Sequence, residues 1–128
     1  MQAVNEAGVL LASKARTAST TSPEMKNRNC RGVIVTLDAT TVATGASLTL
    51  SIEFKDLASG KWEELFEATT AVTAQGTHSY LVYPDAGITA ADDITQIAPW
   101  PLTRYWRVKV THADENSATY SVGYNLLV

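Results

Sequence analysis

Two stretches near the C-terminal end of the chain alternate strictly between apolar and polar positions. At 105–111 the two alternating sets are Trp106, Val108 and Val110 on one side and Tyr105, Arg107, Lys109 and Thr111 on the other. At 119–126 the apolar set is Tyr120, Val122, Tyr124 and Leu126. Because successive side chains of a strand point to opposite faces, each stretch predicts a strand with one buried and one wet face. The short polar connection between them predicts an antiparallel hairpin.

Four further stretches upstream predict strands, at 32–38, 47–55, 61–67 and 77–83. The first of them is apolar on both faces at its start, which indicates a central, well-covered strand. The loop between the second and third ends in Gly60. Because glycine readily adopts a positive φ, this loop is typical of one that closes a hairpin.

Together with a candidate seventh strand near Val9, these stretches predict an all-β protein. Turn signals separate the strands at fairly even spacing, and almost no helical pattern occurs. We therefore expect an antiparallel β-sandwich of about 6–8 strands, jelly-roll or Ig-like in type. A small closed barrel is the main alternative.

Residues 1–30 differ in composition from residues 31–128, which we assign to the sandwich domain. Their only apolar cluster is 9–12, so they have little apolar area to offset the entropy of ordering. Three interpretations are open: an edge strand on the same sandwich, an extended N-terminal arm that adds a strand to a neighbouring subunit, or disorder. The candidate partner-binding residues of this segment are Val9, Leu10, Leu11 and Arg16.

The stretch 84–103 has no strand signal, and so long an irregular stretch in a compact domain is often an interface loop. Pro-Trp-Pro at 99–101 predicts a rigid, extended segment. We interpret Trp100 either as a lid over one end of the sandwich or as an exposed anchor, because tryptophan is enriched at interface hot spots. The candidate partner-binding residues of this loop are Ile94, Ile97 and Trp100.

Composition and charge narrow the choice of partners. The chain has 128 residues and a net charge of −3, which fits one domain without the basic footprint of a nucleic-acid-binding or membrane-surface protein. No apolar run approaches the roughly 20 residues that span a bilayer. We therefore expect neither nucleic acid nor a membrane as partner. The single cysteine, Cys30, excludes an intrachain disulfide and fits synthesis in a reducing cytosol.

The sequence contains no pattern of catalytic or metal-binding residues. His78 and His112 have no Cys or His at ligand spacing. Neighbours in a strand face opposite sides, so Glu63 and Glu64 cannot form the facing carboxylate pair of a glycosidase. Asp92-Asp93 lacks the Asp-x-Asp-x-Asp-Gly context of a calcium loop. We therefore predict a protein that is not an enzyme, with no catalytic residue, cofactor or metal ion.

Aromatic residues outside the expected core leave a glycan-binding module as an alternative. Tyr105 shares the polar face of its strand with Arg107 and Lys109, and rows of aromatic side chains on a sandwich face are typical of carbohydrate stacking. Trp62, beside the expected hairpin loop, has the same two interpretations as Trp100.

Several runs resemble a family of small structural proteins of tailed bacteriophages. The runs are Arg-Gly-Val-Ile-Val-Thr-Leu-Asp at 31–38, Phe-Lys-Asp at 54–56, Ser-Gly-Lys at 59–61, Tyr-Pro at 83–84, Trp-Arg-Val-Lys-Val-Thr-His at 106–112 and Thr-Tyr-Ser-Val-Gly at 119–123. The resemblance covers residues 10–128, and its motifs are strand and turn patterns without catalytic groups. It implies a β-sandwich virion component, and capsid decoration (cement) is the role that we expect from it. Pro-Trp-Pro-Leu at 99–102 departs from the family pattern, so we expect the contact surface there to be particular to this chain.

The resemblance also implies partners and a location. A decoration protein lies on the capsid surface where capsomers meet, after synthesis in the host bacterial cytoplasm, and it bridges several copies of the major capsid protein or other virion proteins. Symmetric closure favours a homodimer or homotrimer. Two alternatives are open: a tail or head-to-tail connector component, and a carbohydrate- or host-binding sandwich.

Overall fold

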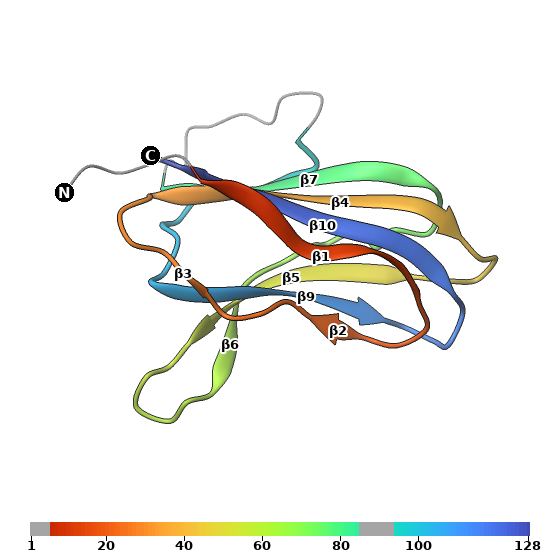
Figure 1. Ribbon diagram of the computed structural model, residues 1–128, viewed down its shortest axis with the longest axis horizontal. Helices are drawn as coiled ribbons and strands as arrows, with labels where there is room; N and C mark the ends of the chain where they lie inside the picture. The colour runs from red at the N-terminus through yellow and green to blue at the C-terminus, as the bar shows by residue number, and fades with distance from the viewer. Residues whose placement is uncertain (1–5, 85–93) are drawn as a thin grey trace.

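The computed structural model describes residues 6–84 and 94–128, which form two β-sheets packed face to face (Figure 1). These residues contain no helix that is long and apolar enough to cross a membrane. The strands of the described residues are, in chain order, β1 (Ala7–Arg16), β2 (Thr20–Thr21), β3 (Met25–Lys26), β4 (Gly32–Val42), β5 (Leu48–Lys55), β6 (Trp62–Glu67), β7 (Gly76–Val82), β8 (Gln96–Ala98), β9 (Tyr105–His112) and β10 (Ala118–Leu127).

The first sheet has the order β1-β10-β4-β7-β8, and the second has the order β2-β9-β5-β6, with β3 also paired to β9. Every pairing between these strands is antiparallel except that of β7 with β8. The prediction of an all-β, mainly antiparallel sandwich is therefore confirmed.

The core lies between the two sheets and is built by the alternation seen in the sequence. The inward side chains of β4, β5, β9 and β10 are almost completely buried, and the largest of them are Trp106, Tyr120, Leu37, Leu48, Leu50 and Ile52. The stretch that was expected to be central, β4, lies between β10 and β7 in the first sheet. The clean alternation of these strands thus identified most of the core correctly.

The predicted hairpin of residues 105–111 with 119–126 is wrong. Both stretches are strands, but β9 pairs with β5 in the second sheet while β10 pairs with β4 and β1 in the first. The chain crosses from one sheet to the other in residues 113–117. Five extended residues span up to about 16 Å, which exceeds the separation of about 10 Å between packed sheets. Alternation shows which face of a strand is buried and does not identify its neighbour.

The other predicted hairpin, β5 with β6, is confirmed. Its loop ends in Gly60 with a φ of 75°, and the Gly60 amide donates a hydrogen bond of 2.7 Å to the Asp56 carbonyl. The Asp56 carboxylate accepts hydrogen bonds from the Ser59 hydroxyl and the Ser59 amide, and these lower the pKa of Asp56. The loop is therefore ordered by its own polar groups.

The N-terminal segment lies at one edge of each sheet of its own sandwich. β1 pairs with β10, and β2 and β3 pair with β9, so the described part of 1–30 forms edge strands rather than an arm extending to a neighbour. The register of β1 shifts between Val9 and Leu11, which places one extra residue in β1. This β-bulge accounts for two consecutive buried leucines, Leu10 and Leu11, in a strand whose other residues are mostly exposed.

The stretch 84–103, expected to be irregular, contains a short strand. β8 pairs in parallel with β7 at Tyr80, Leu81 and Val82. Three residues are too few for periodicity to reveal a strand. Residues 85–93, including Asp92 and Asp93, lie outside the described part of the chain.

Candidate interaction surfaces

The potential metal ligands of the described residues do not cluster. Among them, no group of three or more His, Cys, Asp or Glu residues is placed to hold a metal ion. His112 Nε2 forms a hydrogen bond of 2.8 Å with the Tyr120 hydroxyl. Loss of hydration, followed by the charge of Arg16, lowers the pKa of His112. Cys30 lies in a turn, where the Asn27 side chain bonds both its amide and its carbonyl.

The outward face of the second sheet carries a stacked pair of a cation and an aromatic ring. Glu53 and Arg107 are neighbours across β5 and β9, and Arg107 Nε donates a hydrogen bond of 2.7 Å to Glu53 Oε1. The Arg107 guanidinium lies 4.3 Å from the centroid of the Trp62 ring on β6. The ion pair and the ring contact together fix the planar guanidinium in one orientation.

Two lysines extend this arrangement over the same face. Lys55 forms an ion pair of 2.9 Å with Glu24 and lies 5.9 Å from the Trp62 ring centroid. Lys26 lies 6.0 Å from the ring centroid of Tyr105. We name this surface the cation–aromatic face and define it by Lys26, Lys55, Trp62, Tyr105 and Arg107.

The first sheet presents a different outward surface. Across β4, β7 and β10 its outward side chains include many small polar groups, such as Thr36, Ser79 and Ser121. Thr36 and Ser79 hydrogen-bond to each other at 3.0 Å. The aromatic and guanidinium groups of the cation–aromatic face, Trp62, Tyr105 and Arg107, by contrast lie on the second sheet, and such groups dominate interface hot spots.

A β-bulge in β6 brings Glu64 and Glu67 to one face. Ile52 pairs with Phe66 while Glu53 pairs with Glu64, so Leu65 is the extra residue. The pKa of Glu64 is raised, first by loss of hydration, then by a shared hydrogen bond with Glu67 and by the charges of Glu67 and Glu53. Lys109 acts in the opposite direction. Strict alternation would have put Glu64 and Glu67 on opposite faces, so sequence analysis missed this pair.

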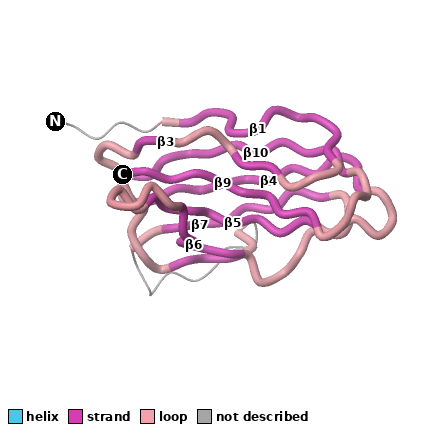
Figure 2. Tube along the Cα trace, turned by 90° about the horizontal axis from the view of Figure 1, so that it is seen from below, coloured by secondary structure: helices cyan, strands magenta, loops and turns pink. Residues whose placement is uncertain are grey.

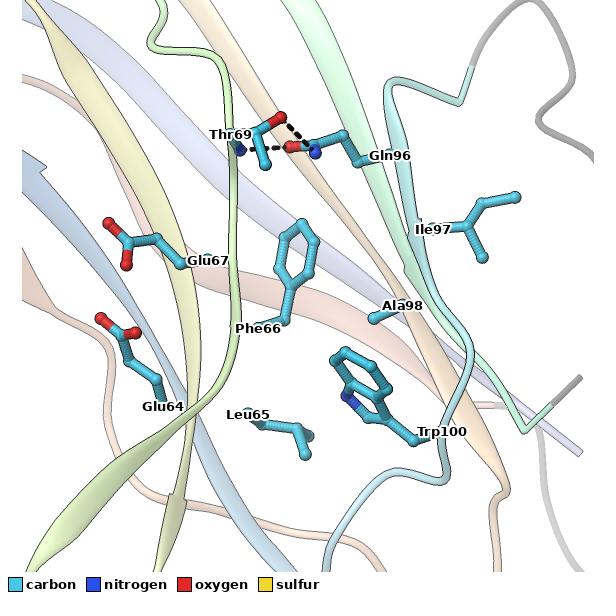
Figure 3. Close-up of a pocket in the computed structure, with 9 residues that line it drawn as sticks. All are labelled: Glu64, Leu65, Phe66, Glu67, Thr69, Gln96, Ile97, Ala98 and Trp100. Atoms are coloured by element: carbon cyan, nitrogen blue, oxygen red, sulfur yellow. Dashed lines mark hydrogen bonds between the residues drawn. The ribbon is translucent and has the colours of Figure 1, made fainter. Parts of the chain in front are cut away.

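A pocket of about 330 Å³ lies between β6 and β8, where the edges of the two sheets meet (Figure 3). At one end the Gln96 side chain accepts from the Thr69 amide and donates to the Thr69 hydroxyl, each at 2.7 Å. Phe66 lies within the pocket and Trp100 lies across from Leu65, whereas the carboxylates of Glu64 and Glu67 point away from Trp100. The pocket therefore has an apolar interior, and its carboxylates are directed to the outward face of β6.

The N-terminal candidate residues have different positions. Val9 is 70% exposed, so it remains available to a partner. Leu10 and Leu11 are buried in the core of their own sandwich, so in this fold their side chains are covered by their own chain. Arg16 packs against its own chain, with its guanidinium 4.7 Å from the Tyr120 ring centroid and an Nη1 hydrogen bond of 2.7 Å to the Tyr120 carbonyl.

Two of the three candidate residues of the long loop line the same pocket. Ile97 and Trp100 both line the pocket between β6 and β8, and Ile94 is partly exposed two residues before β8. Trp100 is 40% exposed, which is compatible with both a lid and an exposed anchor, because part of its ring covers the sandwich edge and part faces solvent. A partner-binding role for these three residues stays a prediction.

Two comparisons with known proteins were negative. No protein-family model matches the sequence, and no curated protein matches it.

Proposed function

We propose that the protein is a non-enzymatic structural component of a bacteriophage virion, a capsid decoration (cement) protein that bridges coat subunits. The proposal is supported by the resemblance of its strand and turn runs to small phage structural proteins. It places the protein on the capsid surface after synthesis in the bacterial cytoplasm, with the major capsid protein as partner. A jelly-roll or Ig-like type is part of the proposal, since the chain crosses between sheets at β9 to β10 as in such sandwiches.

The observation that carries the proposal is the cation–aromatic face. Trp, Tyr and Arg are the residue types that contribute most binding energy at protein interfaces. Here the Arg107 guanidinium is already held by Glu53 and by the Trp62 ring, so little side-chain entropy remains to be lost on binding. The face is formed by paired strands, so it offers a rigid surface to a coat subunit.

A tail or connector component would use the same face, and the number of copies per particle distinguishes it from a decoration protein. The carbohydrate-binding alternative is less favoured by the geometry. A sugar ring stacks on a free aromatic face, and in this protein the Arg107 guanidinium lies 4.3 Å over the Trp62 ring.

The experiment mixes the purified protein with mature capsids that lack it and sediments the capsids. We expect saturable binding at hundreds of copies per shell. Trp62→Ala and Tyr105→Ala should each weaken binding by about tenfold, which corresponds to about 1.4 kcal/mol. Ser121→Ala, on the outward face of the first sheet, is the matched control and should bind as the wild type does.

Substitutions are preferable to a truncation of the N-terminal segment, because deletion of residues 1–21 would remove β1 and two core leucines. Circular dichroism and urea unfolding establish that each variant is folded. The absence of binding to shells, with the protein instead in tail fractions, would overturn the decoration proposal in favour of the tail alternative.

A further inference from the structure

The β1 side and the β6 side of the sandwich carry net charges of opposite sign, although Glu6 precedes β1, Glu24 precedes β3 and Lys61 precedes β6. β1 and β6 lie at opposite sides of the molecule (Figure 2). β1 contains Lys14 and Arg16 and no acidic residue, whereas β6 contains Glu63, Glu64 and Glu67 and no basic residue. Each of these strands is the last of its sheet on that side.

The neighbouring strands extend the two sides. β3, with the exposed Lys26, forms the edge of the second sheet on the β1 side, and β8 forms the edge of the first sheet on the β6 side. We name the side of β1 and β3 the basic side and define it by Lys14, Arg16 and Lys26. We name the side of β6 and β8 the acidic side and define it by Glu63, Glu64 and Glu67.

Each side also exposes a large apolar side chain. Val9, in β1, is 70% exposed, and Trp100, beside the pocket on the acidic side, is 40% exposed. Among the large hydrophobic residues that the structure describes, only Leu57 and Val128 are comparably exposed. Each side therefore combines exposed apolar area with a net charge of one sign, which is the composition of a protein interface with a polar rim.

Contact between like sides of two copies is unfavourable. A seam of two acidic sides would bring together three carboxylates from each copy, and a seam of two basic sides would bring together lysines and arginines. The basic side of one copy and the acidic side of another are complementary. Charge complementarity thus selects one mode of contact and opposes the two symmetric ones.

A cation placed beside Glu64 and Glu67 would offset the repulsion between carboxylates on this face. The bulge at Leu65 brings both to one face of β6, and Glu53, the cross-strand partner of Glu64, adds a third carboxylate nearby. Arg107 is held by Glu53, which leaves Lys109 as the cation that offsets their charge within the chain. A lysine of a second copy placed beside the pair would relieve this repulsion.

We propose that the protein associates with itself head to tail, with the basic side of one copy against the acidic side of the next. This contact is heterologous, so it closes into a ring of three or more copies, or continues as a filament, and does not produce a twofold dimer. The two register shifts in β1 interrupt a regular backbone ladder, so the contact is made mainly by side chains. The inference goes beyond capsid decoration because it concerns contacts between copies and not contacts with the coat.

The test uses two variants, each with one side blocked. Lys14→Glu with Lys26→Glu blocks the basic side, and Glu64→Lys with Glu67→Lys blocks the acidic side. Sedimentation velocity from micromolar to millimolar concentration measures the mass of each. We expect the wild type to form oligomers larger than dimers at low salt and each blocked variant to associate about tenfold or more weakly. Salt at about 1 M, where the Debye length is about 3 Å, should weaken the wild-type association.

Mixing the two blocked variants gives the decisive result. Each variant alone carries charge of one sign on both of its sides, so its copies repel one another. In the mixture the intact sides are complementary and the two reversed sides are complementary as well, so the mixture should regain oligomers larger than dimers. Asp38→Lys, on β4 between β10 and β7 in the first sheet, adds positive charge away from both sides and should associate as the wild type does.

Three outcomes would overturn the inference: a monomeric wild type at every concentration, a wild-type mass for both blocked variants, or no association in the mixture. Glu64→Gln supplies a second measurement. It removes one of two crowded carboxylates, so it should raise the urea midpoint of the monomer while it weakens association. A residue with only a structural role would not raise the urea midpoint and weaken association at the same time. All measurements use the free protein, so their outcome is separate from that of capsid binding.

Discussion

The rings of Trp106 and Tyr124 meet edge to face across the sandwich, with centroids 5.7 Å apart and an interplanar angle of 75°. Trp106 comes from β9 in the second sheet and Tyr124 from β10 in the first. The contact therefore joins the two layers. Aromatic pairs in this geometry stabilise by more than the area that they bury.

The first prediction is a coupling energy between these two rings. Trp106→Leu and Tyr124→Leu should each lower the free energy of unfolding by a few kcal/mol, because each removes buried aromatic volume. The double variant should lose about 0.5–1.5 kcal/mol less than the sum of the single losses. Urea unfolding of the four proteins measures the cycle, and strictly additive losses would contradict a direct contact.

The second prediction concerns two buried tyrosines that differ in their hydroxyl groups. Among the described residues the Tyr80 hydroxyl has no hydrogen-bond partner, whereas the Tyr120 hydroxyl lies 2.8 Å from His112 Nε2. Tyr80→Phe removes an unsatisfied polar group and should leave stability unchanged or raise it by up to about 1 kcal/mol. Tyr120→Phe breaks a hydrogen bond and should cost about 1 kcal/mol. Equal losses of stability in the two variants would contradict this assignment.

The third prediction concerns a close backbone approach at Gly32. A Cβ atom at this position would lie 2.1 Å from the Val82 carbonyl oxygen on the neighbouring strand β7. Backbone cannot move aside as a flexible side chain can, so Gly32→Ala should cost about 2–3 kcal/mol. At Gly76 the nearest atom is 3.4 Å away, in the His78 side chain, and Gly76→Ala is the matched control. Similar urea midpoints for the two variants would argue against the close approach.

Much of the fold was predictable because β-strands with one buried face alternate in sequence. Most of the inward residues of β5, β9 and β10 could be read directly, and so could the positive φ of Gly60. The pairing of β9 and β10 could not be read, since a short connection suits both a hairpin and a crossing between sheets. Strand neighbours depend on long-range contacts that no local pattern encodes.

The candidate surfaces were less predictable for a related reason. The extra residues at Leu10 and Leu65 shift the phase of alternation, so Leu11 became buried and Glu64 joined Glu67 on one face. A bulge has little signal of its own in a single sequence. The Trp62–Arg107 contact depends on β5 lying between β6 and β9, which requires the sheet order.

The fourth prediction is a pH dependence that arises at His112. Loss of hydration and the positive charge of Arg16 lower its pKa below 6.5, and Asp114 acts in the opposite direction. The unfolded chain therefore binds the proton more readily than the folded protein does. The contribution of His112 to the free energy of unfolding is fully present above pH 6.5. It is lost as the pH falls through the lowered pKa of His112 in the folded state.

Urea midpoints at pH 7.5, about one unit above the ordinary histidine pKa, and at lower pH values test this prediction. His112→Gln keeps a group that can bond the Tyr120 hydroxyl and removes the titration, so its midpoint should fall less steeply on acidification than that of the wild type. His78→Gln, in β7 on the first sheet, is the control and should follow the wild type. If His112→Gln and the wild type gave parallel profiles, the pH dependence would have to come from carboxylates elsewhere, and the contact of His112 with Tyr120 would carry no linkage to folding.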